Sequence, residues 1–152
     1  MTTEERLERW ACLIYESMSA PSRTFHRIQH VFYISKDCNE AQTFATLFHD
    51  TMYYNIDDGL SAPQNEVLKG IARVEPLESV VILRKLTRES DNIIAMVMSI
   101  LGFYPSQRIS PFKGLNEFLS EDLAVCCLEE ELNLPELARI AAKIEATTPF
   151  RE

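Results

Sequence analysis

The chain has three histidines, His26, His30 and His49, and the last is followed directly by Asp50. His26 and His30 are four residues apart, so on a helix they lie on one face. Imidazole and carboxylate groups together suit Zn, Mn, Fe, Ni or, with more oxygen ligands, Mg. A cation held by such groups lowers the pKa of a bound water and polarises a phosphoryl oxygen. The spacing therefore predicts a divalent metal site able to hydrolyse a phosphoester.

The same residues also allow an interpretation without a metal. His49 and Asp50 lie in the apolar segment ATLFHDTMYY, where polar groups need partners because burying an unpaired charge is costly. A buried His-Asp hydrogen-bond network would meet that need. His26 could equally be an exposed helix residue, and Asp122 a solvated acid beside Glu121.

Two neighbouring helices must position these side chains. Apolar residues at helical spacing predict one helix over residues 22–36, with His26 and His30 flanking its apolar face. Asn39 is expected to cap a second helix that runs to about Tyr53. That helix is apolar nearly all round, which is typical of a helix at the centre of a core.

The remaining segments also predict helices, and none shows convincing period-two alternation. Loops are expected over residues 55–64 and 102–110, which are rich in Asp, Asn, Gly and Pro. We therefore expect an all-α, single-domain multi-helix bundle over residues 1–152. Its other helices are expected at residues 3–18, 65–72, 76–87, 92–101, 111–132 and 136–146.

Composition excludes some classes of function. The 152 residues carry a formal net charge of −8, which argues against a general nucleic-acid or anionic-membrane binder because both need a basic surface. None of the four cysteines forms a CxxC pair, so buried reduced thiols in a reducing compartment are expected. No apolar run reaches the length of about 18 residues that a membrane span needs, and the opening residues lack a signal-peptide core. We expect a cytoplasmic protein.

Two short stretches resemble a known family. The first is Phe25-His26-Arg27-Ile28-Gln29-His30 and the second Phe48-His49-Asp50-Thr51-Met52-Tyr53. They resemble the HD-domain metal-dependent phosphohydrolases, whose pattern is a His, a His-Asp pair and a distant Asp on helices. The chain is most similar to the small predicted HD phosphohydrolases, which carry two histidines four residues apart before a Phe-His-Asp. The resemblance implies an HD-like helical domain.

The resemblance also implies roles for individual residues. His30 matches the first metal-binding His, and His49 and Asp50 match the His-Asp pair. His26 matches the extra His of the subgroup, a candidate either to support the metal ligands or to contact the substrate phosphate. Asp50 and His26 are the candidate catalytic residues. Asp122, in residues 118–124, resembles the late Asp that completes the metal site, with Asp91 as second choice. One departure is the segment Asp57-Asp58-Gly59, which stands where relatives usually have Asp-Asn-Glu.

Two arginines, Arg23 and Arg27, lie four residues apart near the histidines. Arginine binds phosphate bidentately, so both are candidate substrate-binding residues. The alternative is that they are surface charges paired with nearby acids.

We therefore expect a metal-dependent phosphohydrolase that acts on a nucleotide or other small phosphorylated molecule through a metal-bound hydroxide. The alternative is an HD-like helical binding or regulatory module that has lost catalysis. Three features favour that alternative. The acidic loop at Asp57-Asp58-Gly59 differs from the family pattern, the match of Asp122 to the fourth ligand is weaker, and the chain ends early. Assembly as a homodimer is open.

Overall fold

The computed structural model describes residues 3–24, 27–53, 59–75, 80–84, 91–110 and 114–148. Within these ranges the protein is mostly helical, with a small antiparallel sheet of three strands. The helices are α1 (Thr3–Met18), α2 (Ile28–Ile34), α3 (Glu40–Phe48), α4 (Ala62–Leu68), α5 (Asn92–Leu101), α6 (Leu115–Leu128) and α7 (Leu134–Glu145). The strands are β1 (Ala72–Glu75), β2 (Val80–Leu83) and β3 (Arg108–Ile109).

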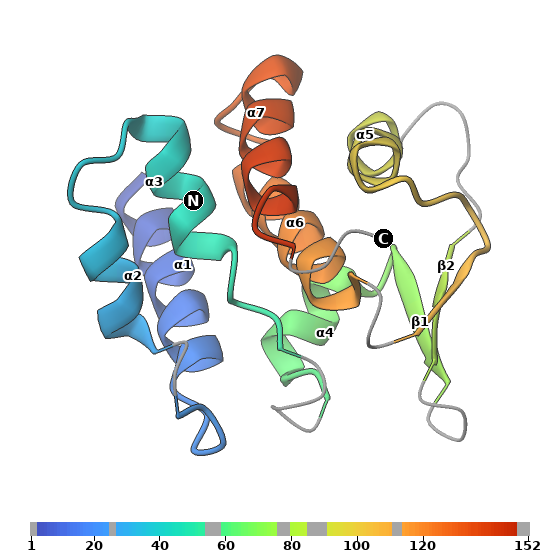
Figure 1. Ribbon diagram of the computed structural model, residues 1–152, viewed down its shortest axis with the longest axis horizontal. Helices are drawn as coiled ribbons and strands as arrows, with labels where there is room; N and C mark the ends of the chain where they lie inside the picture. The colour runs from blue at the N-terminus through green and yellow to red at the C-terminus, as the bar shows by residue number, and fades with distance from the viewer. Residues whose placement is uncertain are drawn as a thin grey trace.

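Helices α6 and α7 form the centre of the molecule (Figure 1). Helix α7 packs against α3, α5 and α6, while α4 packs against α6. Helices α1, α2 and α3 lie on one side of this pair, and α5 and the sheet lie on the other (Figure 1). Helix α6 is buried on nearly all sides, so its residues separate the half of the molecule that carries the histidines from the half that carries the sheet.

Local sequence signals explain where the two helices next to the histidines begin and end. Helix α3 begins with a capping box, in which Asn39 accepts a hydrogen bond from the amide of Gln42 and the Gln42 side chain accepts one from the amide of Asn39. It ends at Phe48, earlier than expected, so His49 is its C-cap residue. Helix α2 begins at Ile28, not near residue 22, and this places His30 in its first turn.

The expectation of a mostly helical protein is confirmed, but the small sheet was not expected. Strand β2 lies inside the helix expected over residues 76–87, and Ala72, expected to end a helix, begins β1. β2 pairs antiparallel with both β1 and β3. The β2 residues, Val-Val-Ile-Leu, are mostly β-branched, and their burial alternates along the strand, as it does when one face of a sheet covers a core.

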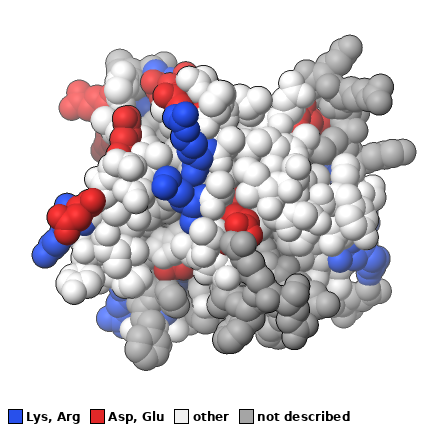
Figure 2. Space-filling model, turned by 45° about the horizontal axis from the view of Figure 1, so that its top comes forward, with Lys and Arg blue, Asp and Glu red and all other residues white. Residues whose placement is uncertain are grey.

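Three further features bear on the sequence-based expectations: the length of the helices, the state of the cysteines and the surface charge. No helix among the described residues is both long enough and apolar enough to cross a membrane. All four cysteines are free thiols, but Cys12 is exposed and the other three are half-buried, so the expectation of buried thiols is met only in part. Lys and Arg side chains form a stripe near the centre of the face shown in Figure 2, although the protein as a whole is acidic.

Candidate metal centre

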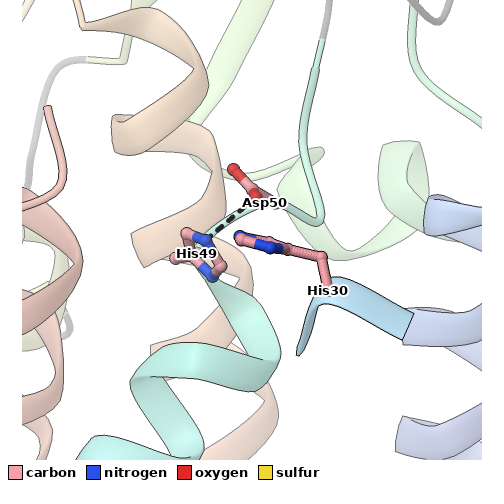
Figure 3. A group of neighbouring side chains, drawn as sticks. All are labelled: His30, His49 and Asp50. Atoms are coloured by element: carbon pink, nitrogen blue, oxygen red, sulfur yellow. Dashed lines mark ion pairs between the residues drawn. The ribbon is translucent and has the colours of Figure 1, made fainter. Parts of the chain in front are cut away.

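His30, His49 and Asp50 come together where the start of α2 meets the end of α3 (Figure 3). Each offers one ligand atom, and these three atoms lie within 4.8 Å of one another. The two imidazole rings are tilted by 49°, with their centroids 6.2 Å apart. The structure therefore brings three of the four predicted metal ligands together.

The two nitrogens of His49 have different partners. Nδ1 donates a hydrogen bond to the carbonyl oxygen of Thr46, one turn earlier in α3, at 2.8 Å. Nε2 lies 2.9 Å from Oδ2 of Asp50. Because the carbonyl can only accept, Nδ1 carries a proton and Nε2 is the atom presented to the site.

These contacts also change how readily His49 is protonated. Burial is the largest influence on the pKa of His49 and lowers it, but the hydrogen bond and negative charge of Asp50, with the Thr46 carbonyl, outweigh it. The pKa of His49 is therefore raised above its ordinary value.

Arg23 holds the backbone at Asp50 in place. Its side chain is buried, with 3% of the residue exposed, and its guanidinium donates to the carbonyl oxygens of Asp50 and Thr51. The Thr51 carbonyl also accepts a hydrogen bond from the Gln64 side chain at 3.1 Å. These bonds give Arg23 a role in positioning the backbone of Asp50, and a contact between Arg23 and substrate stays a prediction.

Arg27 lies on the surface next to this network. It is exposed, and its Nε donates to the carbonyl oxygen of Arg23 at 2.9 Å. A contact between Arg27 and substrate stays a prediction.

Asp122 lies outside the group formed by the two histidines and Asp50, so it does not complete the metal site in this structure. It is fully buried in α6, and burial raises its pKa well above the ordinary value. The α6 residue that contacts the segment after Asp50 is Ser120, whose hydroxyl accepts a hydrogen bond from the amide of Met52 at 3.1 Å. The sequence did not indicate Ser120 and Gln64 as buried hydrogen-bonding residues, because serine and glutamine are usually found on the surface.

Next to Asp122, Glu121 is also fully buried. No carboxyl oxygen of either residue has a hydrogen-bond partner among the described residues. Burial, and then the charges of Asp122, Glu145 and Glu117, raise the pKa of Glu121 to about 9. Glu121 is therefore a neutral acid at pH 7, and burial also favours the neutral form of Asp122.

The remaining predicted residues lie elsewhere. Asp91 occupies the N-cap position of α5 and is not part of the His-His-Asp group. His26, Asp57 and Asp58 lie outside the described residues, so their predicted roles stay predictions.

Comparison with known proteins adds no family to this picture. No protein-family model, no curated protein and no solved structure matches the chain.

Proposed function

We propose that the protein is a metal-dependent phosphohydrolase acting on a nucleotide or other small phosphorylated molecule. The observation that carries this proposal is the convergence of His30, His49 and Asp50 from two helices. The resemblance of the surrounding sequence to HD-domain phosphohydrolases supports the choice of reaction.

The three side chains fit a divalent cation. Two ligands that are each about 2.1 Å from one metal lie at most about 4.2 Å apart, so the present spread of up to 4.8 Å needs only small side-chain movements. Two imidazoles and one carboxylate suit Mn, Fe, Zn or Ni, and Mg with additional oxygen ligands. The Thr46 carbonyl fixes the His49 tautomer with Nε2 toward the site, as is usual for metal-binding histidines.

The chain leaves this site open to small molecules. His30 is exposed, whereas His49 is half-buried and Asp50 buried, so one side of the group faces solvent. A divalent cation bound there would act as a Lewis acid toward a phosphoryl oxygen and lower the pKa of a coordinated water. Asp50 sits beside His49 and would serve both as a ligand and as an acceptor for a proton.

The proposal is tested by measuring phosphate release from a panel of nucleotides and small phosphate esters in the presence of Mn, Fe, Zn, Ni or Mg. Wild-type protein should turn over at least one class of substrate, and the activity should fall to background in His49→Ala. Gln29→Ala is the matched control, because Gln29 precedes His30 on the exposed surface of α2. Wild-type protein that is fully loaded with metal and inactive on the whole panel would contradict the proposal.

The alternative is an HD-like helical module that binds or regulates without catalysis. One observation favours it: among the described residues, no fourth side chain joins the His-His-Asp group. It predicts that His49→Ala changes neither metal content nor phosphate release.

A further inference from the structure

A pocket of about 280 Å³ lies directly beside the candidate metal centre, between α3 and α7. His49 lines it together with Thr46, the residue that fixes the His49 tautomer. The side that faces these residues is formed by Lys143, Ala146 and Thr147, at and after the end of α7. The remaining lining residues are Ile34, Cys38, Gln42 and Ala45.

The charge in this pocket has one sign. Among the described residues that line it, Lys143 is the one with a permanent charge, and none of them is a carboxylate. Among the described residues Lys143 makes no ion pair within 4.0 Å. In a chain of net charge −8, an ammonium group beside His49 that has no carboxylate partner among the described residues is available to a bound anion.

The positive charge continues along the groove between α3 and α7. Lys143 also lines a second concavity of about 460 Å³, where Arg139 lies one helical turn before it. Figure 2 shows a stripe of Lys and Arg side chains on the face that it displays. This second concavity also contains Glu40 and Glu136, so the acid-free pocket beside His49 suits an anion better.

The size and the neutral groups of the pocket fit a phosphate. Its volume is near the lower end of the roughly 300–1,000 Å³ of small-molecule sites, which suits one phosphoryl group and a small remainder. Gln42, Thr46 and Thr147 line it with an amide and two hydroxyl groups, which can donate to phosphate oxygens. No aromatic side chain other than the His49 imidazole lines it, so it offers a nucleobase little surface for stacking.

We propose that the Lys143 pocket binds a phosphate group of the substrate beside the candidate metal centre, with Lys143 as its cationic contact. This inference rests on the proposed function and narrows it to small phosphorylated molecules whose anionic end lies between α3 and α7. It also moves the phosphate-binding role from Arg23, which is held by backbone carbonyls, to α7.

The test is titration of inorganic phosphate into the metal-free full-length protein, followed by calorimetry or by phosphorus NMR. Wild-type protein should bind phosphate, and Lys143→Ala should weaken binding about tenfold, as expected for loss of one charge-assisted contact. Lys143→Arg should restore most of the affinity. Lys69→Ala is the matched control, because Lys69 is exposed and lines a different concavity, between α4 and the sheet.

The outcomes separate this inference from the proposed function. Asp50→Asn should lose metal and turnover but keep most of its phosphate binding, because Asp50 belongs to the metal group and is not among the lining residues of the pocket. Metal-dependent turnover that is unaffected by Lys143→Ala would contradict phosphate binding in the Lys143 pocket but not the proposed hydrolase function. Lys143-dependent phosphate binding by a protein that takes up no metal would contradict the proposed hydrolase function but not phosphate binding in the pocket. Absence of phosphate binding by wild-type protein, or equal weakening by Lys69→Ala, would also overturn the pocket.

Discussion

The guanidinium of Arg23 donates a hydrogen bond to the carbonyl oxygen of Asp50, which lies 27 positions later in the chain. A second bond runs from the same side chain to the carbonyl of Thr51 at 3.3 Å. Arg23 comes just before α2, which carries His30, whereas Asp50 comes just after α3, which ends next to His49. This contact therefore ties together the two segments that must meet for the candidate metal centre to exist.

Replacing Arg23 with Met should destabilise the protein and weaken metal binding. The buried carbonyl of Asp50 would lose a charged donor, which costs about 1–3 kcal/mol. Metal affinity should fall roughly 10- to 100-fold, the effect of removing a group that positions ligands. Urea denaturation and a metal competition titration measure the two effects.

Arg27→Ala is the control for this variant. Arg27 is exposed and makes one bond to the backbone, so its loss should change the free energy of unfolding by less than about 0.5 kcal/mol. Equal effects of the Arg23 and Arg27 variants would contradict a positioning role for Arg23.

Removing the cap of α3 should lower stability without removing the metal. Asn39→Ala removes the bond that the Asn39 side chain accepts from the Gln42 amide, and should cost about 1 kcal/mol in the free energy of unfolding. Asn39→Ser keeps an acceptor at that position and should recover most of the loss. Thermal or urea denaturation measures both variants, and equal stability of wild type and Asn39→Ala would show that the Asn39 side chain does not stabilise the helix.

The buried acid Glu121 should make the protein less stable as pH rises. Its pKa is raised to about 9 in the folded state, whereas in the unfolded chain it returns to the ordinary value near 4.5. Between these values the folded state holds a proton that unfolding releases, so stability is highest below the unfolded pKa and falls toward pH 9. The slope from this one group approaches about 1.4 kcal/mol per pH unit.

Glu121→Gln should flatten that profile, because the amide does not titrate. Asp122 acts in the same direction, so a smaller slope should remain. Glu129→Gln is the control, since Glu129 is exposed at the end of the same helix. Urea denaturation at pH 5, 7 and 9 gives the slopes, and an unchanged slope in Glu121→Gln would show that this carboxyl is not buried as an acid.

Helices with clear local signals could be predicted from the sequence. Helix α1 and helix α5 have the expected bounds, because their apolar spacing and end signals agree. The Asn39 cap was also predicted correctly. Strand β2 was missed because a short apolar run of four residues does not distinguish a buried strand from a helix, and its partners lie elsewhere in the chain.

Some residues of the candidate site could also be predicted from local sequence, and others could not. His49 and Asp50 are adjacent in sequence, and His30 lies one expected helix earlier, so local spacing was enough to group them. The sequence could not show which residue of α6 faces the candidate metal centre. The sequence of a helix that is buried on nearly all sides gives no sign of how the helix is rotated about its axis. Ser120 points toward Met52, whereas the predicted ligand Asp122 lies outside the group.

The metal content of the purified protein tests the account most directly. Elemental analysis of wild type and of Gln29→Ala should find about one divalent ion per chain, and His49→Ala and Asp50→Asn should find almost none. Added Mn, Fe, Zn or Ni should raise the melting temperature of the wild type but not of the two site variants. Wild-type protein that contains no metal, and whose melting temperature is unchanged by each of these ions, would contradict the metal centre and the hydrolase built on it.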